Sequence, residues 1–246
     1  MPVIPATGLA LGALVFVFGG VVKGTLGVGL PLVVVPLLSL GLPATQAIAL
    51  VMMSVLASNL WQAFEGGLSW PGVRRFAPLI AALLLTTLIT VPLTLNLPEV
   101  TLRALLAGVV LLAVVLMALP LDLSMAPRHE GWWSAAVGAL SGVLGGVSSL
   151  TGPIIITYLM SLRLPREVFV GTISVIYLAG ALPLYGSMAA HGRIGLEDAM
   201  LSVAALLPMA LGLQLGRRVR GRLSETWFRR LLFAFLVAVA LLLLLR

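Results

Sequence analysis

The stretch VVKGTLGVGLP, residues 21–31, places one lysine, three glycines and a proline inside an otherwise apolar region. Glycine is conformationally permissive and proline lacks a backbone donor, so both disfavour a continuous helix. We therefore expect the helix to break just after Lys23. A break at this point leaves the cation beside backbone groups that have no helical partner.

The composition around this stretch is that of a membrane protein. Hydrophobic residues make up 61% of the chain and charged residues 9%, and the mean hydropathy is +1.17, far from the values of soluble domains. Long apolar runs such as residues 231–245 suit membrane helices of ~20 residues, whereas the strands of a membrane barrel alternate polar and apolar side chains. We predict an all-α membrane protein whose partner is the lipid bilayer. We interpret its net charge of +7 through topology and expect no nucleic-acid partner.

Ten apolar segments follow one another, at residues 8–22, 30–41, 43–64, 76–95, 99–119, 132–147, 151–162, 165–190, 196–214 and 226–245. The first has no basic region before it, so we interpret it as part of the fold rather than as a signal peptide. Residues 30–41 and 151–162 form segments of only 12 residues each, too short to cross ~30 Å of hydrocarbon at ~1.5 Å per residue. We predict that both are short or re-entrant half-helices that begin at Gly-rich breaks.

The two halves of the chain are related by an offset of 122 residues. The matched positions include Gly20 and Gly142, Pro31 and Pro153, and Pro43 and Pro165. Leucine matches arise often by chance in such a composition, but matched prolines do not. We predict two inverted five-segment repeats, residues 1–121 and 131–246, joined by a connecting loop at residues 122–130.

The arginines predict the topology, because positive charge in short loops favours the cytoplasmic side. If loops alternate sides, eleven arginines share one side, and Arg103, Arg193 and Arg246 share the other. We predict a multi-pass protein of the bacterial inner membrane with both termini outside the cytoplasm. A re-entrant hairpin and a pair of full spans both return the chain to its starting side. The topology therefore does not decide whether the short segments are re-entrant or span the membrane.

Inverted repeats with breaks at corresponding places are typical of secondary transporters, whose substrate site lies where the breaks meet. Half-helices that start near Leu30 and Gly152 would present free N–H groups and positive dipole ends, which favour anions. Lys23 adds a full charge, and a charged group inside a membrane is a functional candidate by default. The predicted substrate-binding residues are Lys23, Gly24, Thr25, Gly27, Gly29, Ser148, Ser149, Thr151, Gly152, Asn59 and Tyr177.

Each of these residues also has a structural interpretation. Lys23 could extend to a lipid headgroup from a helix end, and the hydroxyls and glycines could serve helix packing. Asn59 and Gln62, three residues apart on one helix face, and Tyr177 could make hydrogen bonds between helices. The tryptophans near segment ends, such as Trp61 and Trp132, are predicted to be interfacial anchors.

The duplicated pattern GGVVKGTLGVGLPLVVVPLLSLGLPATQA, residues 19–47, and GALSGVLGGVSSLTGPIIITYLMSLRLPREV, residues 138–168, resembles the sulfite exporter TauE/SafE family over nearly the whole chain. The resemblance implies a membrane permease that moves sulfite, thiosulfate or small organosulfonates, often out of bacterial cells, without ATP hydrolysis. The run of consecutive glycines usual in that family is reduced here to Gly27-Val28-Gly29, which bears on the identity of the substrate.

Other functions fit less well. An anion channel on the same fold stays open as an alternative, whereas a cation filter is disfavoured by Lys23. An enzyme is not expected, because His129 and His191 stand alone and no HExxH or paired-aspartate motif occurs. We expect no cofactor, no metal and a small sulfur anion as substrate, moved out by the membrane potential or with a proton. The sequence leaves monomer and homodimer open.

Overall fold

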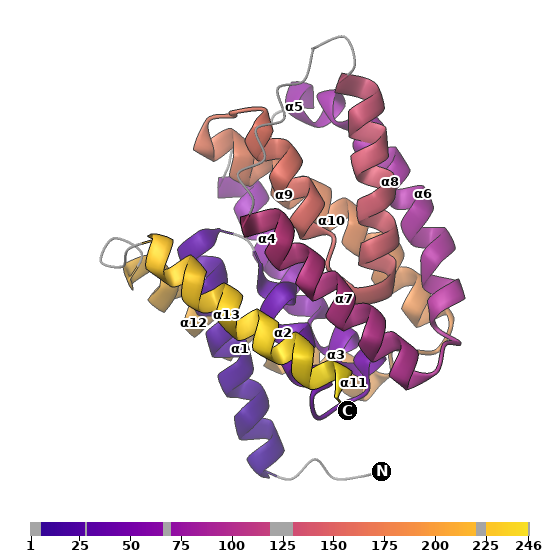
Figure 1. Ribbon diagram of the computed structural model, residues 1–246, viewed down its shortest axis with the longest axis vertical. Coiled ribbons are helices and arrows are strands. Elements are labelled where there is room, and N and C mark those ends of the chain that lie inside the picture. The colour runs from indigo at the N-terminus through magenta and orange to yellow at the C-terminus, as the bar shows by residue number, and fades with distance from the viewer. Residues whose placement is uncertain (1–5, 28, 66–69, 119–129, 220–224, 246) are drawn as a thin grey trace.

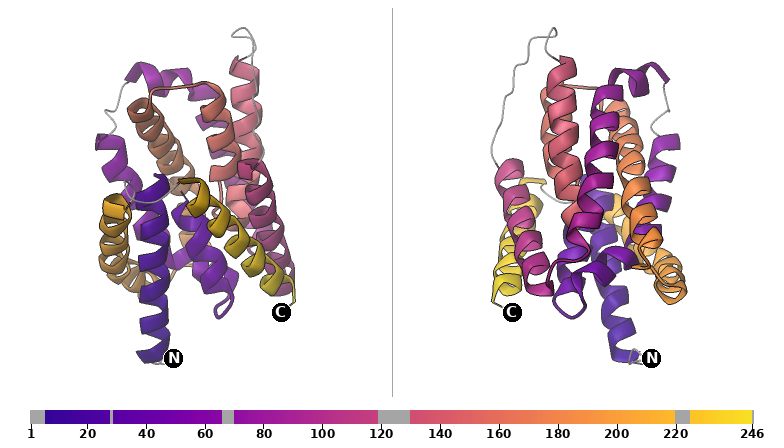
Figure 2. Two further views of the ribbon diagram at one scale, coloured as in Figure 1. Left: turned by 60° about the vertical axis from the view of Figure 1, so that its left-hand side comes forward. Right: turned by 90° about the vertical axis from the view of Figure 1, so that its right-hand side faces the viewer.

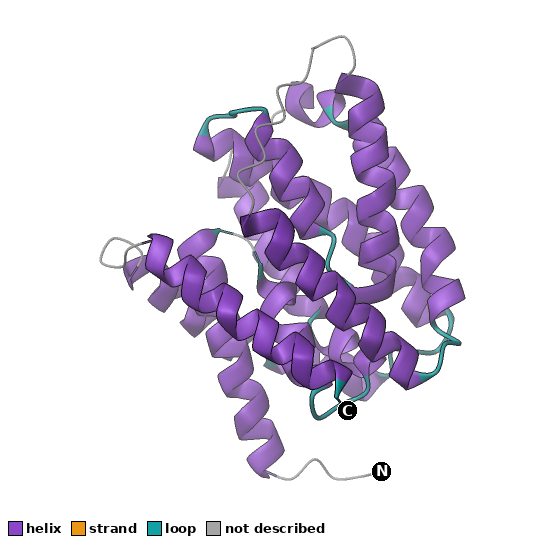
Figure 3. Ribbon diagram, viewed as in Figure 1, coloured by secondary structure: helices purple, strands orange, loops and turns teal. Residues whose placement is uncertain are grey.

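The computed structural model describes residues 6–27, 29–65, 70–118, 130–219 and 225–245, which form helices and no strand (Figures 1 and 3). The helices are α1 (Ala6–Leu26), α2 (Leu30–Ser39), α3 (Ala44–Leu50), α4 (Met52–Glu65), α5 (Trp70–Arg75), α6 (Ala77–Thr94), α7 (Glu99–Ala118), α8 (Glu130–Ser148), α9 (Gly152–Ser161), α10 (Arg166–Ala190), α11 (Leu196–Ala204), α12 (Leu206–Val219) and α13 (Glu225–Leu244). The all-α prediction is confirmed for this part of the chain.

Each predicted segment corresponds to one helix or to two consecutive helices. Residues 43–64 divide at Val51 into α3 and α4, where the amide of Met53 donates to the Ser202 hydroxyl at 2.8 Å. Residues 196–214 divide near Ala205 into α11 and α12, because Pro208 has no N–H to donate to the Ala204 carbonyl. The short helix α5 was not predicted.

Seven helical stretches are long and apolar enough to cross a membrane, counted over the described residues. They are α1, α3 with α4, α6, α7, α10, α11 with α12, and α13. The helices α2 and α9, with 10 residues each, are shorter. The chain is therefore a multi-pass membrane protein.

Two helical hairpins enter the molecule from opposite ends (Figures 1 and 2). The first hairpin is α1 with α2, and α1 begins at the end where α13 finishes. The second is α8 with α9, and α8 begins at the other end, beside α5. The tips of both hairpins reach the middle of the molecule, where Gly29 and Thr151 are the N-cap residues of α2 and α9. The predicted Gly-rich breaks are thus helix ends that meet near the centre. The first break comes later than expected, because α1 stays helical through Lys23 as far as Leu26.

Glycines let each hairpin pack closely against a helix of the other half. A Cβ at Gly24 of α1 would meet the Leu213 carbonyl oxygen of α12, and a Cβ at Gly138 of α8 would meet the Leu79 carbonyl oxygen of α6. The packing interpretation of these glycines is therefore confirmed. Two inverted repeats would produce this arrangement, in which the first helix of each half packs against a helix of the other half. The duplication itself stays a prediction.

Ion pairs join helix ends at the periphery. Arg217 of α12 makes two hydrogen bonds with Glu65 at the end of α4, at 2.8 and 3.3 Å. Arg75 of α5 pairs with Glu130 of α8 at 2.6 Å. Both carboxylates lie at helix ends, Glu65 at the end of α4 and Glu130 at the start of α8.

Candidate functional site

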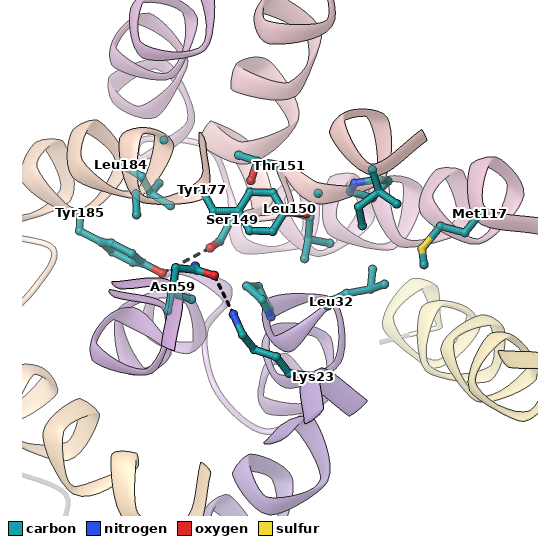
Figure 4. A pocket seen from close by; sticks show the side chains of 18 residues that line it. Lys23, Leu32, Asn59, Met117, Ser149, Leu150, Thr151, Tyr177, Leu184 and Tyr185 are labelled. Carbon is teal, nitrogen blue, oxygen red and sulfur yellow. Dashed lines mark hydrogen bonds between the residues drawn. The ribbon is translucent and has the colours of Figure 1, made fainter. Parts of the chain in front are cut away.

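A cavity of about 40 Å³ lies between the two hairpin tips and the middle of α4 and α10, with room for about three water-sized groups. Figure 4 shows Lys23 pointing from α1 toward Asn59 of α4, with Ser149, Thr151 and Tyr177 on the opposite side. The polar side chains of the lining are Lys23, Asn59, Ser149, Thr151, Tyr177 and Tyr185. No carboxylate and no histidine of the described chain lines it.

Lys23 is the charged group of this cavity. Its residue surface is only 3% exposed, and its Nζ donates to Asn59 Oδ1 at 2.7 Å. Lys23 therefore does not extend to a lipid headgroup. An ammonium has three donors, and Asn59 is its one hydrogen-bond partner among the described residues. Two donors remain for a ligand or for water.

The first turns of α2 and α9 face the same cavity. Gly29, Pro31, Thr151, Gly152 and Pro153 all line it. Neither N-cap residue, Gly29 or Thr151, makes a side-chain capping hydrogen bond, so the backbone donors of both helix starts lack their usual partner. Gly29 has φ of 97°, a left-handed conformation that suits glycine. Both helix starts add positive potential to that of Lys23.

The α8–α9 tip is held by its own serines. Ser148 donates to the Leu144 carbonyl at 2.6 Å and accepts from the Leu150 amide at 3.2 Å. Ser149 has φ of 63°, which is uncommon outside glycine and occurs preferentially at functional sites. Its hydroxyl lies 3.4 Å from the Tyr185 hydroxyl. The tip is therefore shaped by local hydrogen bonds, and of these two serines Ser149 lines the cavity and Ser148 does not.

Tyr177 contributes a hydroxyl without a partner. The oxygen is buried and makes no hydrogen bond within the described structure. A Cβ at Gly152 would lie 2.7 Å from it, so the glycine makes room for the hydroxyl beside the first turn of α9. A buried polar atom without a partner is unfavourable, which points to a ligand or water at this position.

Seven of the predicted binding residues line the cavity: Lys23, Gly29, Asn59, Ser149, Thr151, Gly152 and Tyr177. The other four have structural contacts. Gly24 packs on α12, Thr25 donates to the Val21 carbonyl at 2.8 Å, Gly27 accepts from Gln62, and Ser148 braces the tip. Val28, His129 and the predicted connecting loop, apart from Glu130, lie outside the described residues.

Tyr185 was not among the predicted binding residues. It bonds Ser149 of the α8–α9 tip and also lines the cavity. Ala181 and Leu184 of α10 line it too and were not predicted. The signal was present, because Tyr177, Ala181, Leu184 and Tyr185 have the spacing of one helical face. For Gln62 the expected hydrogen bond between helices is confirmed, because its Oε1 accepts from the Ser174 hydroxyl of α10 at 3.5 Å. Its Nε2 also donates to the Gly27 carbonyl, just beyond the end of α1, at 3.3 Å.

The arrangement can bind a small anion. Lys23 and the starts of α2 and α9 present positive potential, and the hydroxyls of the lining can donate to an oxyanion. The residues that the structure describes contain no cluster of three or more His, Cys, Asp or Glu side chains suited to a metal ion. The cavity offers no histidine or carboxylate as a general base.

Comparison with known proteins gives one match. The family model of the sulfite exporter TauE/SafE covers residues 12–243. No curated protein and no solved structure matches the chain. The chain therefore belongs to the sulfite exporter TauE/SafE family, whose members are membrane transporters and not enzymes.

Proposed function

We propose that the protein is a permease that exports sulfite, or a closely related small sulfur oxyanion, through the cavity beside Lys23. The observation that carries the proposal is the buried ammonium of Lys23, whose single hydrogen-bond partner in the described part of the chain is neutral. A charge in this position is unfavourable unless it is paired. An anion between Lys23 and the starts of α2 and α9 would pair it.

The charge and size of the cavity support a compact dianion. Lys23 contributes one positive charge and each helix start contributes about half a charge, about two in total. The volume of about 40 Å³ suits the three oxygens of sulfite better than a long organic chain. Thiosulfate and small organosulfonates are the next candidates, and chloride matches the charge less well.

The topology supports export by the membrane potential. On this proposal the α1–α2 and α8–α9 hairpins each return to their own side, so α1 does not cross the membrane. The other six of the seven candidate spans then leave the start of α1 and the end of α13 on one side. With the arginine-rich ends of α5 and α12 in the cytoplasm of a bacterial cell, the chain ends lie outside. A potential of 100 mV, negative inside, then favours exit by ~2.3 kcal/mol per charge. The cavity lining contains no carboxylate that would carry a coupled proton.

The test is sulfite efflux from proteoliposomes that contain the purified full-length protein under an imposed potential. Lys23→Met removes the buried charge, and Arg218→Met removes an exposed charge at the end of α12 as the matched control. We expect saturable efflux that falls at least ~10-fold in Lys23→Met, because a hydrogen bond to a charged group contributes ~1.5–3 kcal/mol. Arg218→Met should transport like the wild type.

Undiminished efflux in Lys23→Met would contradict the proposed site. Efflux that never saturates with sulfite concentration would favour an anion channel on the same fold. Absence of sulfite, thiosulfate and sulfonate flux in the wild type would contradict the proposed substrate class.

A further inference from the structure

A second, smaller cavity lies close to the first and shares one side chain with it. Its volume is about 10 Å³, room for about one water molecule. It lies among α3, α6, α7, α8 and α10, and its lining includes Thr45, Thr94, Gly146 and Met188. Leu184 of α10 lines both cavities. Its side chain is only 4% exposed and apolar, so it separates the two spaces.

The second cavity leads toward the end of the molecule where α6 finishes and α7 begins. A charged layer of Glu99, Arg103, Arg193 and Asp198 lies at that end, and two lining residues of the cavity contact it. The Leu95 carbonyl accepts from Arg193 at 2.7 Å, and the Ala44 amide donates to Glu99 at 2.8 Å. This is also the end at which α1 begins and α13 finishes (Figure 2).

The charges of this layer leave Arg193 without an acidic partner among the described residues. Glu99 is paired with Arg103 at 3.0 Å, and Asp198 accepts from the Gly195 amide at 3.0 Å. Arg193 is exposed, and its hydrogen-bond partners, the Leu95 carbonyl and the Asn96 side chain, are neutral. A guanidinium with neutral partners at the mouth of a cavity attracts anions.

We propose that the anion leaves the Lys23 cavity past Leu184, crosses the second cavity beside Thr45 and Thr94, and exits next to Arg193. This route rests on the proposed function and adds the gate and the exit of the same site. Leu184 is the barrier, because it is the lining residue common to both cavities. Thr94 supplies a hydroxyl on the way, now bonded to the Val91 carbonyl at 2.9 Å.

The chain contains no cysteine, so single cysteines can map the route. Thr45→Cys, Thr94→Cys and Leu184→Cys mark the mouth, the second cavity and the barrier. Ile176→Cys is the matched control, because Ile176 also lies on α10, is fully buried and lines neither cavity. Intact cells and inverted membrane vesicles are treated with an anionic and a cationic membrane-impermeant methanethiosulfonate, and Thr45→Cys identifies the side from which the route opens.

We expect the Thr94 and Leu184 variants to react from the same side as Thr45→Cys, at least ~10-fold faster than Ile176→Cys, and faster with the anionic than with the cationic reagent. The adduct at Thr94 should reduce sulfite efflux at least ~10-fold, since its bulk fills the second cavity. If both variants react no faster than Ile176→Cys, or react only from the opposite side, the route is wrong.

Two further results keep the route and the proposed function apart. Arg193→Gln, an exposed change that should leave the fold intact, is expected to slow labelling of Thr94→Cys by the anionic reagent about 10-fold while labelling by the cationic reagent is not slowed. Equal slowing of both reagents, or none, contradicts the exit at Arg193. Labelling does not depend on sulfite. If the protein shows the expected labelling pattern but no sulfite flux, the proposed route is supported and sulfite as the substrate is contradicted.

Discussion

The hydrogen bond between Lys23 and Asn59 predicts that replacing Asn59 lowers the stability of the protein far more than replacing Lys23 does. Asn59→Leu keeps the approximate size of the side chain and leaves a buried ammonium without its one described protein partner. Lys23→Met removes the charge and leaves only a neutral amide oxygen unpaired. Loss of a buried hydrogen bond to a charged group costs ~1.5–3 kcal/mol of stability.

For a chain of this length 1 kcal/mol shifts the melting temperature by ~2–4 °C, so Asn59→Leu should melt ~3–12 °C below the wild type. Lys23→Met should melt close to the wild type or above it, because an apolar group replaces a desolvated charge. The double variant Lys23→Met with Asn59→Leu should recover most of the loss, since two apolar side chains then face each other.

The measurement is thermal stability followed by gel filtration of the purified protein in detergent, with and without sulfite. Sulfite should restore part of the loss in Asn59→Leu, because the anion becomes the partner of the ammonium, and should not stabilise Lys23→Met. A melting point of Asn59→Leu within about 1 °C of the wild type, well below the expected shift, would refute the reasoning. A double variant as unstable as Asn59→Leu would also refute it.

Three further predictions concern the packing of α1 against α12, the hydroxyl of Tyr177 and the ion pair between Glu65 and Arg217. Gly24→Ala should destabilise the protein by ~1–3 kcal/mol in the same thermal assay, since its Cβ meets the α12 backbone, while Gly108→Ala, in open space, should be neutral or stabilising by up to ~1 kcal/mol. Tyr177→Phe should leave stability unchanged or higher and weaken sulfite binding ~2–12-fold in equilibrium dialysis, because its hydroxyl has no protein partner. Glu65→Gln removes the half-exposed pair with Arg217 and should cost at most ~1 kcal/mol in the thermal assay; a larger loss would mean that this pair holds α4 and α12 together.

The helices could be predicted because their signals are local. Apolar runs that end at glycine, proline or charged and polar residues define the segments, and the folded chain keeps them. The division between α3 and α4 could not be predicted, because the Met53 amide is satisfied by Ser202 from a helix about 150 residues away. The helix α5 has six residues and two arginines, so no apolar periodicity marks it.

The residues that line the candidate site could be predicted in part, where their sequence signals are local. Lys23 and the two proline-marked helix starts stand out in the sequence, and the fold brings them to one cavity. Gly24 and Gly29 look equivalent in the sequence, but Gly24 faces α12 and Gly29 faces the cavity. Only the packing of α1 against α12 separates them. Leu184 has no polar atom, so its position between two cavities depends entirely on the tertiary structure.

On the proposed function, the charge of the cavity also bears on how the transport cycle runs. Without an anion, about two positive charges from Lys23 and the two helix starts face only neutral side chains among the described residues that line the cavity, and Asn59 is the acceptor of Lys23. A bound dianion brings the net charge close to zero, and moving a neutral complex between low-dielectric walls is opposed far less than moving an unpaired charge. The loaded site should therefore change its access more readily than the empty one. On this proposal Lys23 serves two purposes: it selects an anion, and it makes the change of access depend on the presence of that anion.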